Sequence, residues 1–425
     1  MQRIAITNMA GARNRGCEAL VQSIVSELLA EGGGSPLRIS LHTGDEVYDR
    51  EQFSAGVDAV YSTSNLPPPR LTPGQQRAYF GVAKWLNKTP LRRFLPSSTL
   101  DSLNADLIIA TGGDNFSSDY GGFPRHARTL QVGTPVALLA QTIGPFKDSD
   151  ARLFKASTGN IVLCTVRETE TLHYINEIAP ELHPELTADV AFLLPVTPPE
   201  VARDIVEVDN RFALKGRRLL GLSVSAGILS YRGDVDSAHY LQEIVAFIDE
   251  LNTQGWSVLL IPHVQERWRR NNDVYVCREV FRRIKLQNEN AVLYSPMSAS
   301  DFKGVIGLCE VLVGARTHTT IASMSQGIPT VSIAYSRKAW GIMRDYYGEA
   351  LAHATTIDVA DLDRERLKEA VDRALANGRT DAIAQEKRRL AAVNFLRVRE
   401  YLAARAAKDT PKRSSAANLL RSSAE

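Results

Sequence analysis

Four charged or titratable side chains stand out in the last third of the chain, because each follows a run typical of a buried strand. Arg316 and His318 follow the apolar run that ends at Gly314, and Arg337 and Lys338 follow the next such run. In an open α/β sheet, ligands bind at the carboxyl ends of the strands. Three permanent cations and one imidazole at such an edge predict a site for an anion that carries phosphate or carboxylate.

The first half of the chain repeats this arrangement. Asp114 and Asn115 follow the apolar run Leu107–Ala110 after two glycines, and Arg167 follows the run 161–166. Two glycines at a strand end allow a ligand to approach the backbone closely. The alternative for Asp114 or Asn115 is the N-cap of a following helix.

Two further segments are weaker candidates for ligand contact. The glycine-containing loop 8–16, with Arg13 and Asn14, precedes a helical stripe that starts at Leu20, and its backbone N–H groups could face an anion. Its spacing fits neither the Walker lysine loop nor G-x-G-x-x-G, and the alternative is a turn whose Arg13 and Arg15 face water. In the second half, His263 follows Pro262 at a strand end and is as readily structural as functional.

The elements that must position these residues form two α/β series. We expect a first Rossmann-like domain over 1–197 and a second over 198–360, separated by a linker with Pro195, Pro198 and Pro199. C-terminal helices are expected over 361–408 and a disordered tail over 409–425. The predicted fold is therefore α/β, with two Rossmann-like domains facing across a cleft in a GT-B-like layout and a C-terminal helical segment. Residues 61–100 are expected to be loop-rich, with a short helix around Gln75–Leu86.

Composition narrows the classes of partner. The 425 residues are 44% hydrophobic and 23% charged, with a net charge of +2, so nucleic acid is not expected as a partner. Basic clusters such as Arg267, Arg269 and Arg270 are interpreted as solvated faces. The four cysteines form no Cys-x-x-Cys pair, which argues against a disulfide framework and a cysteine-based zinc site. The sequence shows neither a signal peptide nor a membrane-spanning run, so the protein is expected in the cytoplasm. No metal or cofactor is expected.

An ordered set of short motifs resembles the polysaccharide pyruvyltransferase family. The second half contributes Arg316-x-His318, followed about 17 residues later by Tyr335-x-x-Lys338. The matches run in order over most of residues 4–345, and together they are more specific than any one of them. The remaining matches are Gly11-x-x-Asn14-x-Gly16-x-Glu18-Ala19, Gly112-Gly113-Asp114, Gln141-x-x-Gly144-Pro145, Val166-Arg167-Glu168, Asp189-x-Ala191-Phe192 and Pro262-His263. Thr317 departs from the pattern, because relatives often carry a bulkier apolar residue there.

The resemblance implies transfer of pyruvate from phosphoenolpyruvate onto the hydroxyls of a sugar in a polysaccharide or its precursor, forming a ketal, as in exopolysaccharide and cell-envelope biosynthesis. It places donor binding and catalysis on Arg316 and His318, with Arg167 as a further donor contact. The first domain would then hold the glycan acceptor and the second the donor. A lipid-linked acceptor would bring the enzyme to the inner face of the membrane.

The chemistry of the donor assigns a role to each candidate. Arginine pairs with carboxylate and phosphate in bidentate fashion, so Arg316 and Arg167 are the expected clamps, with Lys338 as an additional charge. His318 is the expected proton donor, since its pKa lies near neutrality, and the alternative is a hydrogen bond to phosphate. Asp114 is expected to activate or hold the acceptor hydroxyl. Further substrate contacts are assigned to Arg13, Asn14, Asn115, His263 and Tyr335.

Two other functions compete with this interpretation. A glycosyltransferase of the same layout could use the cations for a nucleotide-sugar diphosphate, and a non-catalytic glycan-binding or assembly protein could keep the fold alone. A dinucleotide oxidoreductase is disfavoured, because no G-x-G-x-x-G precedes a suitable acidic residue. The acceptor sugar, its linkage and the oligomeric state are not predicted.

Overall fold

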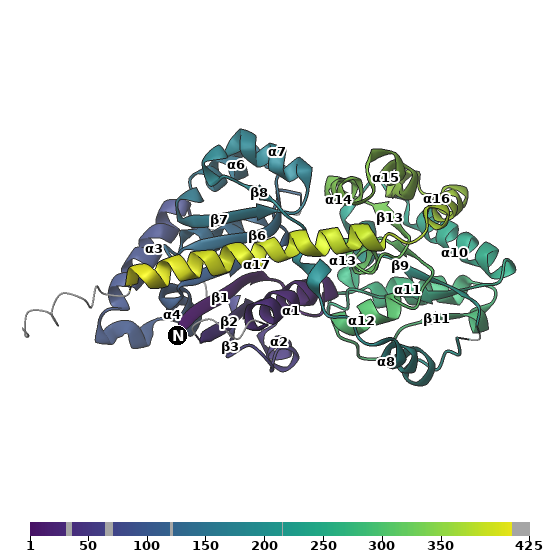
Figure 1. Cartoon of the computed structure of the whole chain (residues 1–425), viewed down its shortest axis with the longest axis horizontal. Coiled ribbons are helices and arrows are strands. Elements are labelled where there is room, and N and C mark those ends of the chain that lie inside the picture. The colour runs from purple at the N-terminus through teal and green to yellow at the C-terminus, as the bar shows by residue number, and fades with distance from the viewer. Residues whose placement is uncertain (31–35, 64–70, 120–121, 215, 410–425) are drawn as a thin grey trace, which may run out of the picture.

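Parallel β-sheets form the centre of both halves of the molecule (Figure 1). The structure, a computed structural model, describes residues 1–30, 36–63, 71–119, 122–214 and 216–409. The predicted disordered tail lies outside these residues, except for Asp409, which ends the last helix.

The first sheet has the strand order β3-β2-β1-β4-β6-β7-β8, and β5 pairs with β6. Every strand pair in it is parallel, with Ile4 of β1 opposite Ile39 of β2 and Leu107 of β4. The central strands are buried on both faces, which is why they read as continuous apolar runs. The strands are β1 (Gln2–Met9), β2 (Leu37–Thr43), β3 (Ala59–Ser62), β4 (Leu107–Ala110), β5 (Gly113–Phe116), β6 (Val136–Ile143), β7 (Ile161–Val166) and β8 (Glu185–Leu186).

Helices of the first half connect these strands. Helix α1 carries the predicted apolar stripe, and its Leu20, Val21 and Ile24 are buried in the core. The helices are α1 (Arg15–Leu29), α2 (Glu46–Gln52), α3 (Pro73–Leu86), α4 (Ser97–Asn104), α5 (Phe123–His126), α6 (Asp148–Lys155) and α7 (Thr169–Ile178), with short 3-10 helices η2 (Pro90–Phe94), η3 (Ala127–Gln131) and η6 (Val190–Leu193).

The second sheet has the strand order β11-β10-β9-β12-β13-β14, again with parallel pairs. Its strands are β9 (Arg218–Ser223), β10 (Trp256–Leu260), β11 (Asn290–Val292), β12 (Val311–Gly314), β13 (Thr330–Ala334) and β14 (Thr356–Asp358). Its helices are α8 (Pro199–Asp204), α9 (Ala226–Tyr231), α10 (Ser237–Thr253), α11 (Asp273–Arg283), α12 (Ala299–Ile306), α13 (Thr317–Met324), α14 (Arg337–Tyr347), α15 (Glu349–Thr355) and α16 (Arg364–Asn377), with the 3-10 helix η8 (Arg269–Asn271). The predicted fold class, two Rossmann-like α/β units with a C-terminal helical segment, is confirmed.

The last helix, α17 (Asp381–Asp409), leaves the second half and returns across the first sheet (Figure 1). Asn394 is buried there, where its Nδ2 donates to the Ala188 carbonyl at 3.1 Å and its Oδ1 accepts from Thr187 Oγ1 at 3.2 Å. Near the helix end, Gln2 Nε2 donates to the Leu402 carbonyl at 2.9 Å. The C-terminal helical segment therefore fastens the two halves to each other.

One local expectation, and one alternative, differ from the structure. The described part of 61–100 is mostly helical rather than loop-rich, because α3, η2 and α4 follow one another there, with a capping box from Thr72 and Gln75 at the start of α3. Asp114 lies in strand β5 and caps no helix. After Tyr335 the chain enters helix α14, and Lys338 lies in its first turn.

Across the described ranges, we find no helix that is both long enough and apolar enough to cross a lipid bilayer.

Candidate active site in the cleft between the two sheets

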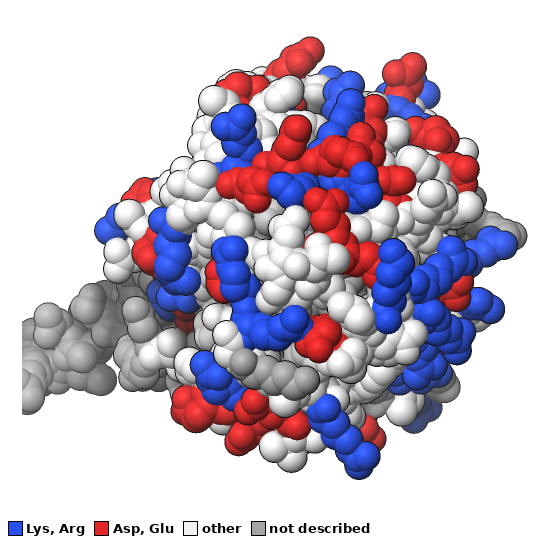
Figure 2. Space-filling model, turned by 90° about the vertical axis from the view of Figure 1, so that its right-hand side faces the viewer, with Lys and Arg blue, Asp and Glu red and all other residues white. Residues whose placement is uncertain are grey.

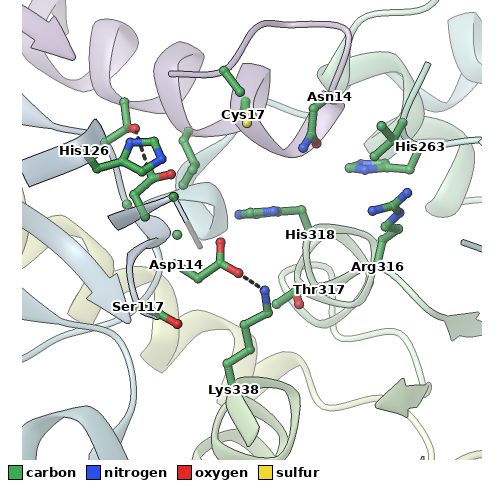
Figure 3. Close-up of a pocket in the computed structure, with 18 of the residues that line it drawn as sticks. Asn14, Cys17, Asp114, Ser117, His126, His263, Arg316, Thr317, His318 and Lys338 are labelled. Atoms are coloured by element: carbon green, nitrogen blue, oxygen red, sulfur yellow. Dashed lines mark hydrogen bonds and ion pairs between the residues drawn. The ribbon is translucent and has the colours of Figure 1, made fainter. Parts of the chain in front are cut away.

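A cavity of about 330 Å³ opens where the carboxyl ends of both sheets face each other (Figure 3). Both halves contribute to its wall, so the folds of both sheets are needed to assemble it. The polar residues that line it are Asn14, Thr111, Asp114, Asn115, Ser117, His126 and Arg167 from the first half and His263, Asn271, Arg316, Thr317, His318, Tyr335 and Lys338 from the second.

Arg316 is held in place by a buried carboxylate. It is the residue before α13, and it donates to the two carboxylate oxygens of Asp273 from Nε at 3.1 Å and from Nη2 at 2.7 Å. Asp273 is itself fixed, because it accepts backbone N–H groups from Ala226 at 3.0 Å and Val264 at 2.9 Å. A planar guanidinium fixed in this way is oriented before any substrate arrives.

His318 points towards the middle of the pocket (Figure 3). Its ring lies so close to α1 that a Cβ atom at Gly16 would be 2.3 Å from Nδ1, so only glycine fits there. Nε2 lies 3.8 Å from Oδ2 of Asp189 and has no hydrogen-bond partner among the described residues. Burial lowers the pKa of His318 to about 4, against the opposing effect of Asp189. The imidazole is therefore neutral in the ligand-free protein near pH 7.

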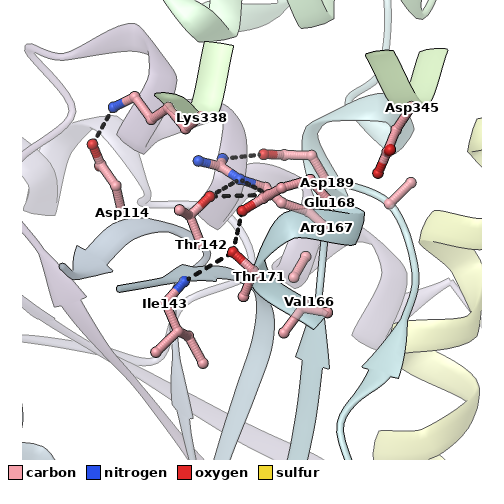
Figure 4. A network of polar contacts seen from close by, with 12 residues as sticks. Asp114, Thr142, Ile143, Val166, Arg167, Glu168, Thr171, Asp189, Lys338 and Asp345 are labelled. Carbon is pink, nitrogen blue, oxygen red and sulfur yellow. Dashed lines mark hydrogen bonds and ion pairs between the residues drawn. The ribbon is translucent and has the colours of Figure 1, made fainter. Parts of the chain in front are cut away.

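Asp114 and Lys338 form an ion pair across the cleft, one from β5 and the other from the first turn of α14 (Figures 3 and 4). Burial raises the pKa of Asp114, but the positive charges of Lys338 and Arg167 outweigh it and lower that pKa to about 2. The sequence analysis assigned Asp114 to the acceptor hydroxyl and Lys338 to the donor. In the structure, the two side chains contact each other.

Arg167 is the centre of a buried polar network (Figure 4). It donates from Nη1 to Asp189 at 2.6 Å and from Nε to Thr142 at 2.8 Å, and Glu168 lies 3.4 Å away. Burial lowers the pKa of Arg167, and the carboxylates of Asp189 and Glu168 more than compensate, so that it rises overall. Arg167 lines the pocket with its charge already balanced by two carboxylates.

The remaining predicted contacts divide into two groups. Asn14, Asn115, His263 and Tyr335 all line the pocket, whereas Arg13 is not part of its lining. Asn14 caps α1 by accepting the Gly16 N–H at 3.0 Å, and Asn115 donates to the Asn8 carbonyl at 3.0 Å. Burial lowers the pKa of His263 well below its ordinary value.

The arginines of the loop before α1 are occupied elsewhere. Arg13 pairs with Asp45 at 2.9 Å and lies over the ring of Tyr48 at 4.0 Å. Arg15 is buried and pairs with Glu18 at 2.7 Å, so the alternative in which it faces water is wrong.

Sequence reasoning did not assign a role to several residues that the fold brings to the site. Asp273 and Asn271 hold Arg316, with the Asn271 bond at 3.0 Å, and Asp189 lies between Arg167 and His318. Asp189 was part of the family pattern, which could have pointed to it, whereas Asp273 lies in an unremarkable basic helix. Cys17 also lines the pocket, and burial raises the pKa of its thiol to about 12, so it is a thiol rather than a thiolate.

Within the ranges that the structure describes, no group of three or more His, Cys, Asp or Glu side chains is placed to hold a metal ion. That the reaction needs no metal or cofactor stays a prediction.

Comparison with known proteins shows the fold and the family. The chain superimposes on UDP-GlcNAc 2-epimerase from Methanocaldococcus jannaschii with a TM-score of 0.58 at 13% identity, covering 94% of this chain and all (100%) of the other. UDP-GlcNAc 2-epimerase from Neisseria meningitidis, bound to UDP-GlcNAc, gives a TM-score of 0.54 at 10% identity, covering 95% of this chain and 100% of the other. At such identities the likeness shows the fold alone, and it agrees with the GT-B-like layout.

Sequence relatives are more specific about the family. Amylovoran biosynthesis protein AmsJ from Erwinia amylovora is 20% identical over 283 residues, which cover 65% of this chain and 68% of that protein. Residues 47–337 match the family described as polysaccharide pyruvyl transferase, and this range is more than half of the chain and includes Asp114, Arg167 and Arg316. The chain therefore belongs to the polysaccharide pyruvyl transferase family.

Proposed function

We propose that the protein transfers pyruvate from phosphoenolpyruvate to two hydroxyls of a glycan, forming a ketal and releasing phosphate. Family membership and the likeness to a protein of amylovoran biosynthesis support a role in polysaccharide modification. The observation that carries the finer proposal is the pairing of a fixed arginine fork, Arg316, with an unpartnered histidine nitrogen, His318 Nε2, in one cleft. Phosphoenolpyruvate is proposed as a co-substrate, and no cofactor is invoked.

Donor binding is assigned to the cations on the second half of the cleft. Arg316, oriented by Asp273 on one side, would present the side of its guanidinium that lines the cleft to the carboxylate or the phosphate. Lys338 would add a positive charge from the first turn of α14. Arg167 contributes a charge at the opposite wall, although Asp189 and Glu168 already offset it. Because one carboxylate, Asp273, offsets Arg316 whereas two offset Arg167, Arg167 is proposed as the weaker donor contact.

Proton transfer is assigned to His318. The methylene carbon of phosphoenolpyruvate must gain a proton while a glycan hydroxyl adds to the neighbouring carbon. A neutral imidazole cannot supply that proton, and burial lowers the pKa of His318 to about 4. The negative charges of a bound donor would raise this pKa, because a nearby anion stabilises the imidazolium. The substrate would thus create the acid that it needs, and the proton would leave from Nε2.

The acceptor side is assigned to Asp114. Its pKa of about 2 keeps the carboxylate ionised at neutral pH, so it can accept a hydrogen bond from a glycan hydroxyl. When the second hydroxyl attacks the same carbon, the bond to phosphate breaks and phosphate leaves with the electron pair. The two hydroxyls lose one proton each: one replaces the proton that His318 gives to the methylene carbon, and the other leaves with the phosphate, so that atoms and charge balance.

Isothermal titration calorimetry with phosphoenolpyruvate and, separately, a panel of nucleotide sugars tests the donor. We expect binding of phosphoenolpyruvate that weakens in Arg316→Lys, and weaker or no binding of the nucleotide sugars. Binding of a nucleotide sugar in place of phosphoenolpyruvate would instead support the glycosyltransferase alternative. Release of phosphate that depends on an added glycan would exclude the non-catalytic alternative.

A further inference from the structure

Helix α3 presents apolar side chains to solvent on one face. Gln76, Phe80 and Ala83 recur at i, i+4 and i+7 and are buried against the first half of the molecule. On the outward side, Val82 and Trp85 are 58% and 62% exposed. Among the described residues, the fold therefore covers one face of the helix and leaves the apolar side chains of Val82 and Trp85 open, at the left-hand end of the molecule in Figure 1.

The adjoining 3-10 helix η2 continues this open surface. All of its residues, Pro90–Phe94, are exposed, and Leu91 and Phe94 reach 43% and 71%. The guanidinium of Arg93 lies 4.9 Å from the centre of the Phe94 ring. Apolar and cationic side chains thus alternate on the same surface, which we call the α3–η2 surface: Arg77, Val82, Lys84, Trp85, Lys88, Leu91, Arg92, Arg93 and Phe94.

The charge of this part of the chain has one sign. The chain has 48 acidic residues in 425, yet residues 59–100 contain none. The five basic residues of the α3–η2 surface are all exposed. The far end of the molecule is different, since Figure 2 shows acidic side chains in a band across its upper part and basic ones gathered on its right-hand side.

We propose that the α3–η2 surface binds the surface of a membrane that contains anionic lipids. Trp and Phe side chains favour the boundary between headgroups and acyl chains, and Lys and Arg are drawn to lipid phosphates. Trp, Phe and Arg are also enriched in protein interfaces, but a surface whose charges are all positive matches an anionic lipid surface best. The attachment would be peripheral, with the apolar side chains inserted only as far as the headgroup boundary.

The α3–η2 surface is connected to the candidate active site through the 3-10 helix η3. Helix α3 packs on η3, and His126, the residue directly before η3, lines the pocket. Docking would hold the first half of the molecule, which forms one wall of the cleft, on the membrane that would carry a lipid-linked glycan. This last consequence rests on the proposed function, whereas the docking itself does not.

Sedimentation of the full-length protein with lipid vesicles tests the proposal and needs neither donor nor acceptor. We expect binding that is roughly tenfold or more tighter to vesicles of phosphatidylcholine mixed with phosphatidylglycerol than to phosphatidylcholine alone, and weaker at high salt. The variants Trp85→Ser/Phe94→Ser and Arg92→Gln/Arg93→Gln should each lose most of this binding. Circular dichroism and thermal unfolding would establish that both remain folded.

Trp268→Ser provides the matched control, since Trp268 is 78% exposed beside arginines on the other half of the molecule. It should bind vesicles as the wild type does. Equal binding to both kinds of vesicle, full binding by both α3–η2 variants, or the same loss in Trp268→Ser would each overturn the proposal. A third outcome would identify an interface between copies of the chain instead. In that case the wild type would self-associate without binding vesicles, and Trp85→Ser/Phe94→Ser would abolish the self-association.

Discussion

The Nε2 atom of His318 lies 3.8 Å from Oδ2 of Asp189, and the same oxygen accepts a hydrogen bond from Arg167 at 2.6 Å. The carboxylate of Asp189 thus lies near two groups at once. It faces the imidazole of His318, and it offsets part of the positive charge of Arg167. Because this carboxylate is shared, it does not hold a proton on His318 by itself. The protonation of His318 is then governed by the anion that enters the cleft, which leads to the first prediction.

Replacing His318 by alanine is expected to lower kcat by about 10²–10⁴, the usual contribution of a general acid. Affinity for phosphoenolpyruvate should change much less, because Arg316 and Lys338 remain. Phosphate release at saturating donor, together with calorimetric titration, separates the two quantities. Arg13→Gln, outside the pocket, is the control and should keep normal turnover. If only donor affinity fell, His318 would be a phosphate ligand and not the acid.

Replacing Arg316 by lysine is expected to abolish most activity and to weaken binding of phosphoenolpyruvate about 10- to 100-fold, because one point charge replaces a fork of charge-assisted hydrogen bonds. The ammonium group would also lose the two-point contact with Asp273. Arg218→Lys offers a matched control on the surface, where Arg218 pairs with Glu310. Near-normal turnover and donor affinity in Arg316→Lys would refute the clamp.

Replacing Asp114 by asparagine is expected to separate donor binding from turnover. The variant removes a negative charge that pairs with Lys338 in the ligand-free cleft, so phosphoenolpyruvate should bind at least as tightly as to the wild type. Glycan-dependent phosphate release should fall, because a neutral amide accepts a weaker hydrogen bond from the acceptor hydroxyl than a carboxylate does. Calorimetry and a phosphate assay measure the two effects. A parallel loss of donor affinity would show that Asp114 supports the donor site instead.

The sequence was sufficient to predict which residues lie at the strand ends, but not which of their side chains contact each other. Arg316, His318 and Lys338 could be assigned to one edge, because apolar runs mark buried strands and polar residues follow them. Asp273 could not be assigned, since its pairing with Arg316 joins residues 43 positions apart that only the tertiary fold brings together. Likewise, the pattern gave no reason to pair Asp114 with Lys338, 224 positions away.

The packing partners of the C-terminal helices could not be predicted from the sequence either. Leu390, Val393 and Leu396 formed only a thin apolar stripe in the sequence, and a stripe does not say which sheet it covers. In the structure Ala391, Phe395 and Val398 are buried, and Leu396 is exposed. The helix packs against η6, β6 and β7 of the first half, and the sequence pattern alone does not identify these partners.

Stability is expected to fall as the pH is lowered from about 6.5 to about 4. Burial lowers the pKa values of His318 and His126 from 6.5 to about 4, so between these values the unfolded chain binds more protons than the folded one. Each histidine would cost roughly 1.4 kcal/mol per unit of pKa difference once the pH lies below its folded value. Urea unfolding at several pH values measures the slope, which should be shallower in His126→Asn. An unchanged slope would mean that His126 is not held neutral.

Helix α17 is expected to contribute strongly to the stability of the whole chain. Phe395 is fully buried, so Phe395→Ala should lower the free energy of unfolding by roughly 3–5 kcal/mol. The neighbouring Leu396, 47% exposed, provides the control, and Leu396→Ala should change that free energy by no more than about 0.5 kcal/mol. Because α17 packs against β6, β7 and η6 of the first half after leaving the second, the loss should appear in urea unfolding followed by probes in either half. Equal effects of the two substitutions would contradict the burial of one face, and a loss confined to one half would show that the helix does not couple them.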